Sequence, residues 1–326
     1  MPSELVGVPF RAIEAIDAGL VTARQLQSSA WARVARGIYV TREHADTPDV
    51  RLQTLRLVLG DDPSAVVCGQ TAAWIYGADD PRRGDSPAIE ITRPVRAPGS
   101  TTTGVGRRRL TLRGTPDCVV PATGLSEVDQ DVIEVDGLRI TSPLRTCFDL
   151  MRTRHLVEAV AVADAFAYRT GLPLGLLDAY CSSRHRWPQV RLARQAVTLA
   201  SRYSRSPGET RLRMVVVLSG FDEPLVNVPV TELGSGRVIG IPDLTVLGRG
   251  GRLVGLEYDG EYHRQEEQRD RDRLRENRLA SLAGIPLLRY DADSIRRHRP
   301  LIVSQIEDLT QQQSRTPLRD TDFRRS

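Results

Sequence analysis

The chain of 326 residues contains no lysine, so all 45 of its basic side chains are arginines. Codon bias in a GC-rich genome is the simplest explanation of this skew. Whatever its cause, the absence excludes every mechanism that depends on a catalytic lysine. The net charge of +4 and the pI of about 9.1 are compatible with nucleic-acid binding but do not establish it, because the excess is small and spread along the chain.

The sequence also lacks long apolar runs and closely paired cysteines. No segment approaches the roughly 20 apolar residues of a membrane span, and the N-terminus has no basic segment followed by an apolar run that would direct secretion. The four cysteines are scattered and show no CxxC spacing, which argues against a zinc cluster: Cys68, Cys118, Cys147 and Cys181. We therefore expect a protein of a reducing compartment, the cytoplasm, with no membrane association.

The composition is that of an ordinary soluble protein, with 40% hydrophobic and 26% charged residues. The chain is long enough for two or three domains and a substantial core. Its patterns predict a mixed α+β fold in five parts. These are a helix-turn-helix-like region (1–60), a β-rich middle region (61–150), a helical joint (151–203), an α/β domain (204–310) and a polar, disordered tail (311–326).

The first part has helix-turn-helix character. An amphipathic helix over residues 10–18 ends at Gly19, and Thr22 can cap a second, short helix over residues 23–28. Residues 31–40 then alternate apolar with basic side chains, as the wing strand of such a region does.

The run GLVTARQL followed by WARVARGIYV resembles the N-terminal winged-helix region of AbiEi-type antitoxins. In that family a recognition helix separates the two stretches, whereas this chain has only residues 27–30 between them. Without that helix the major groove has no reader. We therefore expect a degenerate winged-helix-like region without sequence-specific DNA binding of its own.

The middle region is predicted to be β structure from residue 88 to residue 140, with an Asp-Gly hairpin turn at 136–137. Ser142 and Pro143 then mark the start of a helix. The run GLRITSPLRTCFDLMR is similar to the middle region that accompanies AbiEi-type N-termini, which implies a structural joint. Three arginines at 107–109 open one strand. They are either the solvated residues of a sheet edge or contacts to phosphate, and the solvated edge is the preferred interpretation.

A spaced set of acids is the most informative feature of the last domain. Asp243 belongs to one short predicted strand. Glu257 and Asp259 belong to the next strand and project from the same face of it, because side chains alternate between the two faces of a strand. The glycine-rich turn at 248–252 can bring the two strands together. Two carboxylates about 4 Å apart repel by roughly 4 kcal/mol at an effective dielectric near 20, so the set needs protons, arginines or a metal. Mg²⁺ takes such oxygen ligands, which predicts a metal site.

The elements around these acids follow the order helix, three strands, helix and strand. The predicted ranges are a capped helix from Ser206, strands over 225–230, 237–247 and 253–259, a charged helix over 266–283 and a strand over 285–290. This is the order of the restriction-endonuclease-like core. The stretches SPGETRLR, IPDL, GLEYDGEYH, RDRDRLRENRLASLAG and IPLLRY resemble the domains related to very-short-patch-repair (Vsr) endonucleases, over residues 204–300.

The resemblance implies a PD-(D/E)xK-type metal nuclease site. It makes Asp243 the principal metal ligand, Glu257 the second ligand and Glu209 a supporting acid from the helix. The lysine of the general pattern would stand two residues after Glu257, where this chain has Asp259. Vsr-like members commonly use histidine instead, so His263 becomes the candidate to orient or deprotonate a water, or to contact the scissile phosphate.

Each candidate also has a purely structural explanation. Glu209 is a favourable acid in the first turn of a helix. Asp259 before a glycine is as readily a turn residue as a ligand, and a lone His263 is usually a surface histidine. Three arginines of the charged helix are suited to neutralising phosphate: Arg269, Arg273 and Arg278. Charges of both signs at i, i+4 spacing along this helix nevertheless favour a solvated face.

Two functions of different classes follow. The first is a metal-dependent DNA endonuclease-like protein of DNA repair or defence, in which Mg²⁺ or Mn²⁺ activates a water for phosphodiester hydrolysis. The alternative is a non-catalytic AbiEi-like antitoxin or transcriptional regulator that uses the nuclease fold as a binding scaffold. An RNA-directed enzyme is a weaker third possibility, because no aromatic RNA-binding motif is present. Expected partners are DNA and a cognate toxin or other protein, with no nucleotide cofactor.

Overall fold

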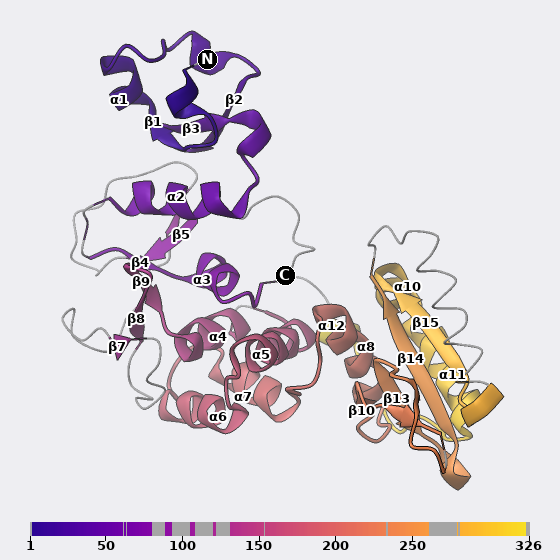
Figure 1. The fold of residues 1–326 in the computed structure, drawn as a ribbon. Coiled ribbons are helices and arrows are strands. Elements are labelled where there is room, and N and C mark those ends of the chain that lie inside the picture. The colour runs from indigo at the N-terminus through magenta and orange to yellow at the C-terminus, as the bar shows by residue number, and fades with distance from the viewer. Residues whose placement is uncertain are drawn as a thin grey trace. The chain divides into compact units, whose positions relative to one another are not determined.

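The computed structural model describes residues 2–60, 62, 64–79, 89–92, 105–107, 120–121, 131–152, 154–232, 234–260, 279 and 281–323. Helices and strands are mixed throughout, which confirms the predicted α+β class (Figure 1). The chain divides into two compact units, Met1–Thr146 and Cys147–Ser326, and the division falls within helix α4 (Pro143–Met151). None of the helices within the described ranges has the length and apolarity needed to cross a bilayer.

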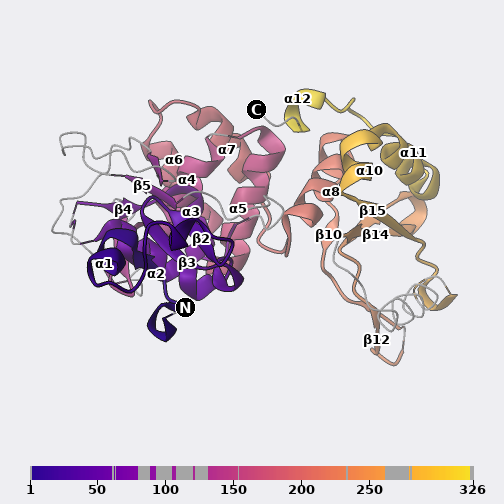
Figure 2. The same ribbon diagram turned by 90° about the horizontal axis from the view of Figure 1, so that it is seen from above.

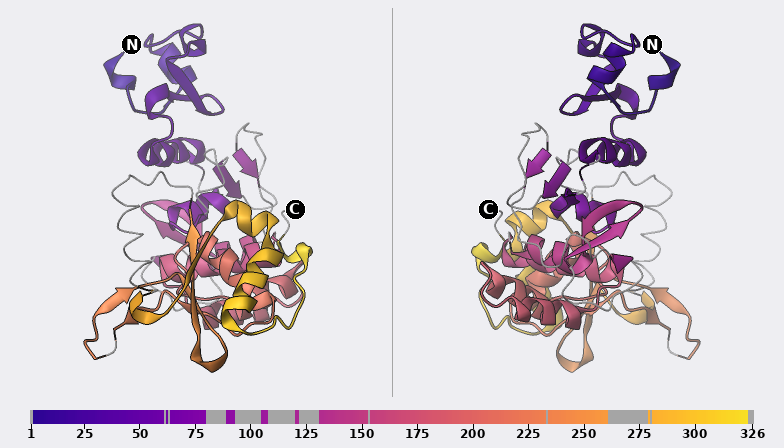
Figure 3. Two further views of the ribbon diagram at one scale, coloured as in Figure 1. Left: turned by 90° about the vertical axis from the view of Figure 1, so that its right-hand side faces the viewer. Right: turned by 90° about the vertical axis from the view of Figure 1, so that its left-hand side faces the viewer.

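The N-terminal module is a small sheet of order β1-β3-β2 with one short helix (Figure 3, indigo). Its elements are β1 (Phe10–Arg11), α1 (Ala12–Asp17), a 3-10 turn (Gln25–Gln27), β2 (Trp31–Ala35) and β3 (Ile38–Thr41). The predicted first helix begins two residues late, because Phe10 and Arg11 pair with β3. The predicted single wing strand is a hairpin that turns at Gly37, where φ is +72°. Residues 28–30 contain no helix, as the sequence predicted.

The rest of the first unit is a six-stranded sheet with helices α2 (Pro48–Leu59) and α3 (Gly69–Ile75). The strands, in the order β6-β5-β4-β9-β8-β7, are Val105–Arg107, Ile89–Thr92, Val66–Val67, Leu138–Thr141, Val132–Val135 and Val120–Pro121. The β8–β9 hairpin turns at Asp136 and Gly137, both with positive φ, which confirms the predicted turn. Of the arginines at 107–109, the last two lie outside the described residues, as does the side chain of the first.

The second unit begins with helices α5 (Leu156–Thr170), α6 (Leu174–Ser183) and α7 (Val190–Thr198), as predicted for this stretch (Figure 1). Helix α5 packs against α8 (Pro207–Leu218), and two ion pairs join them: Glu158 with Arg211, and Asp164 with Arg213 at 3.0 Å. Burial raises the pKa of the Asp164 carboxyl, and Arg213 lowers it in part. These contacts fix the helical joint to the C-terminal sheet.

The C-terminal sheet has the order β10-β13-β14-β15. Its strands are β10 (Leu225–Val226), β13 (Leu244–Leu247), β14 (Leu253–Asp259) and β15 (Leu287–Asp291); β14 and β15 are parallel and the other pairs antiparallel. Helices α8, α10 (Ala292–Arg297) and α11 (Arg299–Thr310) share its apolar core. A separate ribbon of β11 (Val230–Thr231) and β12 (Val238–Gly240) projects beyond the sheet (Figure 2). Of the predicted charged helix, only Leu279 and residues 281–283 are described.

The C-terminal segment differs from the expected disordered tail over residues 311–323. The backbone N–H groups of Arg315 and Thr316 donate to the Ser219 carbonyl oxygen at 2.9 and 3.0 Å. Leu318 and Phe323 pack against the core of the second unit, Phe323 from the short helix α12 (Asp320–Phe323). Two apolar anchors and these backbone bonds are enough to order a segment that has no apolar period in its sequence.

Candidate functional site

Asp243 lies at the start of β13, beside the strand that carries Glu257. The register pairs Leu244 with Leu256, so continuing the antiparallel ladder by one residue places Asp243 opposite Glu257. The backbone N–H of Tyr258 donates to Asp243 Oδ2 at 2.8 Å. The structure therefore brings two of the candidate acids to the same end of one strand pair.

Glu257 is buried in the middle of the sheet and faces an arginine. Its cross-strand partner on the parallel strand β15 is Arg289, whose Nε donates to Glu257 Oε2 at 3.0 Å. The side chain of Glu257 is 8% exposed and that of Arg289 is 26% exposed. A guanidinium in this position stabilises the ionised carboxylate by charge and hydrogen bonding. Sequence reasoning did not single out Arg289, because only the register of β14 with β15 selects it.

Glu209 joins the same region from the first turn of α8, which Ser206 caps by accepting the Glu209 N–H at 3.2 Å. Glu209 Oε2 accepts from the Arg205 N–H and from Asn227 Nδ2, both at 2.9 Å. The Asn227 N–H in turn donates to the Asp243 carbonyl oxygen at 2.9 Å. Asn227 therefore links Glu209 to Asp243.

Asn227 is a site residue that sequence reasoning missed. It interrupts the predicted strand over 225–230 with a φ of +53°, in the left-handed region that asparagine tolerates better than most residues. An asparagine inside an otherwise apolar, β-prone run was the available signal. We call Glu209, Asn227, Asp243, Glu257 and Arg289 the acid network.

Of the two further candidates, Asp259 and His263, only Asp259 lies within the described residues. Asp259 ends β14 on the same face as Glu257 and pairs in register with Asp291. Asp291 caps α10 by accepting the Ser294 N–H at 2.7 Å, and hydrogen bonds from the Ser294 side chain and then its backbone lower the pKa of the Asp291 carboxyl. His263 lies outside the described residues, as do the arginines predicted to contact phosphate: Arg269, Arg273 and Arg278.

Protein hydrogen bonds hold the acid network together within the described residues. Within the described ranges, no group of three histidine, cysteine, aspartate or glutamate residues could hold a metal ion. Each of the three acids accepts hydrogen bonds from protein donors: Asp243 from Tyr258, Glu257 from Arg289 and Glu209 from Arg205 and Asn227. The arginine supplies the positive charge that a buried carboxylate requires.

Two comparisons bear on this chain. Residues 65–170 match the AbiEi antitoxin C-terminal domain, so an AbiEi-like segment occupies about a third of the chain. A comparison with curated proteins gives no match. The crystal structure of the RV2827C protein from Mycobacterium tuberculosis is similar at 15% identity and a TM-score of 0.33, over 63% of this chain and 74% of that one. Nothing about fold or function follows from a similarity of this size.

Proposed function

We propose that the chain is a non-catalytic regulator of the toxin–antitoxin type that acts in the cytoplasm. The AbiEi antitoxin match over residues 65–170 is the observation that carries this proposal. In it, the AbiEi-like segment counteracts a cognate toxin, and the C-terminal sheet serves as a scaffold for binding. The N-terminal module is not the DNA reader of this regulator, because residues 28–30 supply no recognition helix.

The chemistry of the acid network supports the role of a scaffold. One oxygen of each acid accepts hydrogen bonds from backbone, amide or guanidinium donors, so each acid has a structural use that needs no metal. The chain also contains no lysine at all, so the general pattern's lysine cannot come from another position. Both features favour a folded core that keeps the acids for stability.

The proposal predicts a cognate toxin encoded beside this chain's gene, and growth rescue in cells that express that toxin tests it. The full chain is expected to restore growth, and a variant carrying Glu209→Gln, Asp243→Asn and Glu257→Gln is expected to restore it equally well. These substitutions keep the size of each side chain while removing its charge. Lack of rescue by the wild type would refute the regulator, and loss of rescue by a correctly folded variant would refute the scaffold role.

A second candidate is metal-dependent phosphodiester hydrolysis. The juxtaposition of Asp243 and Glu257 at one end of β13 and β14 favours it. The described residues do not fit an Mg²⁺ or Mn²⁺ ion as they are arranged. Arg289 donates to one oxygen of Glu257, so a metal ion at Glu257 would have to bind beside this guanidinium or displace it.

Plasmid nicking with Mg²⁺ or Mn²⁺ separates the two candidates. A nuclease at this site requires metal-dependent cleavage by the wild type that disappears in Asp243→Ala and in chelator. The proposed regulator requires that neither protein cleaves. Cleavage that persists in Asp243→Ala would mean that the acid network is not its source.

A further inference from the structure

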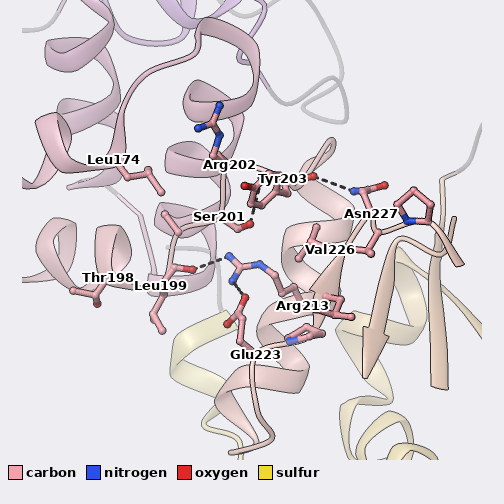
Figure 4. Close-up of a pocket in the computed structure, with 15 residues that line it drawn as sticks. Leu174, Thr198, Leu199, Ser201, Arg202, Tyr203, Arg213, Glu223, Val226 and Asn227 are labelled. Atoms are coloured by element: carbon pink, nitrogen blue, oxygen red, sulfur yellow. Dashed lines mark hydrogen bonds and ion pairs between the residues drawn. The ribbon is translucent and has the colours of Figure 1, made fainter. Parts of the chain in front are cut away.

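A cavity of about 660 Å³ lies beside the acid network in the second unit (Figure 4). This volume is within the usual range for small-molecule sites, about 300–1,000 Å³. Its walls come from the end of the helical joint, residues 198–203, and from residues 223–229, which include strand β10. Asn227 belongs both to this wall and to the acid network, because its amide nitrogen donates to the Tyr203 carbonyl oxygen at 3.0 Å and to Glu209.

The wall is mainly apolar, and its aromatic residue is open to solvent. Aliphatic and proline residues are eight of the fifteen that line it: Leu174, Leu199, Ala200, Pro224, Leu225, Val226, Val228 and Pro229. Tyr203 is 62% exposed, one of the most exposed large hydrophobic residues in the described part of the chain. Tyr203 therefore lines the cavity and leaves most of its surface open to a ligand.

Positive charge accompanies this ring. The guanidinium of Arg202 lies over it, with Cζ 5.8 Å from the ring centroid, and Arg205 is exposed two residues further along. Deeper in the wall, Arg213 is held by Glu223 at 2.7 Å and by the Leu199 carbonyl oxygen at 2.7 Å. Arg213 thus pairs with groups of the wall itself, while Arg202 lines the cavity as an exposed residue.

The adjoining sheet edge disfavours a peptide strand as the occupant. An added strand needs a row of backbone donors and acceptors, and β10 is only two residues long. Pro224 and Pro229 flank it without N–H groups, and Asn227 turns the backbone out of the extended conformation. An aromatic face with arginines beside an apolar recess suits instead a flat heterocycle that carries a phosphate.

We propose that this cavity binds an unstacked base of single-stranded nucleic acid. Tyr203 stacks on the base, the apolar wall takes its other face, and Arg202 and Arg205 contact the neighbouring phosphates. A base inside a duplex is stacked and paired, so it cannot enter the recess without the cost of being flipped out. The proposal goes beyond the regulator role and gives the second unit a ligand that the degenerate N-terminal module does not read.

Fluorescence anisotropy with a short labelled single strand, and with a duplex of the same sequence, tests this on the full chain. The wild type is expected to bind the single strand more tightly than the duplex. Tyr203→Ala should weaken single-strand binding about 5- to 150-fold, the range for loss of one base–aromatic stack. Tyr203→Phe keeps the ring and should bind like the wild type. Arg202→Gln should reduce the slope of log Kd against log salt by about 0.7.

Tyr168→Ala is the matched control. Tyr168 is 42% exposed and has the Arg169 guanidinium over its ring at 5.4 Å, yet it lies on α5 and does not line the cavity. The Tyr168→Ala variant should bind the single strand like the wild type. The proposal fails if the wild type does not prefer the single strand, if Tyr203→Ala binds unchanged, or if Tyr168→Ala loses as much affinity. Growth rescue is measured separately, so failure here is distinguishable from failure of the regulator.

Discussion

Arg289 is the residue that determines the state of the acid network. It supplies Glu257 with a charge-assisted bond across the parallel pair β14–β15, in a place that is mostly removed from water. A buried carboxylate that loses such a partner retains the desolvation cost without the compensating charge. Substituting Arg289 would also remove the cation that competes with a metal for Glu257. Such a substitution therefore separates a structural use of the acids from a catalytic one.

Arg289→Met is expected to lower the free energy of unfolding by about 1–3 kcal/mol, because Glu257 stays buried without its guanidinium partner. Adding Glu257→Gln should recover part of the loss, since an amide is cheaper to bury than a carboxylate. Urea unfolding of the wild type, both single variants and the double variant gives the interaction energy directly.

Arg297→Met provides the comparison within the same unit. Arg297 pairs with Asp293 at 2.9 Å, but the two side chains are 61% and 50% exposed. Loss of this exposed ion pair should change the free energy of unfolding by less than about 0.5 kcal/mol. Equal effects of Arg289→Met and Arg297→Met would show that burial of the Glu257 pair contributes nothing.

Local signals placed the start of α4 and the β8–β9 turn correctly, whereas a distant strand pairing displaced the start of α1. Ser142 accepts the Arg145 N–H at 3.3 Å as the start of α4, and the Asp136-Gly137 hairpin turns where its two residues dictate. By contrast, Phe10 was predicted to be helical, but in the structure it pairs with Tyr39 of β3. Strand pairing outweighs helix propensity at a helix end, and no local pattern reveals the pairing.

Gly248 shows such a distant constraint in the turn between β13 and β14. A Cβ at this position would lie 2.5 Å from the Thr310 carbonyl oxygen and 2.8 Å from Thr310 Cα, at the end of α11. Because backbone atoms cannot yield as a side chain does, Gly248→Ala is expected to lower the free energy of unfolding by about 1–3 kcal/mol. Thermal unfolding followed by circular dichroism measures the loss.

Gly175→Ala is the control for this glycine. Gly175 lies in α6, where an added Cβ would meet no atom within 4 Å and where φ is an ordinary negative angle. The substitution should be neutral or stabilising by up to about 1 kcal/mol, because alanine favours helix more than glycine does. A Gly248→Ala protein as stable as Gly175→Ala would mean that α11 does not hold this turn.

The candidate site illustrates what a single sequence can give. Strand alternation and the glycine-rich turn were enough to place Asp243 and Glu257 at one end of a strand pair, and the capped helix start was enough to place Glu209 in a first turn. The partners of these acids were not accessible, because Asn227 and Arg289 meet them only through the folded sheet. Those partners show that the three acids are hydrogen-bonded within the described part of the chain, and the metal site stays a prediction.

The AbiEi-like segment, residues 65–170, runs through both compact units and contains the whole of α4. The N-terminal module lies outside it and has its own core: Leu5, Phe10, Ala15, Val21, Leu26 and Trp31. If residues 65–170 neutralise the toxin, the N-terminal module is dispensable for that activity. A truncation inside residues 65–170 should then abolish it.

Deletion of residues 2–46 tests this division of labour. The deletion keeps Thr47, which caps α2 by accepting the Val50 N–H at 3.4 Å, so the next helix retains its start. Growth rescue is expected to equal that of the full chain, whereas a chain ending at Arg154, inside the matched segment, should give none. Circular dichroism and cooperative melting must show that the deletion variant is folded. Loss of rescue by that folded variant would place neutralisation in the N-terminal module and overturn its assignment to residues 65–170.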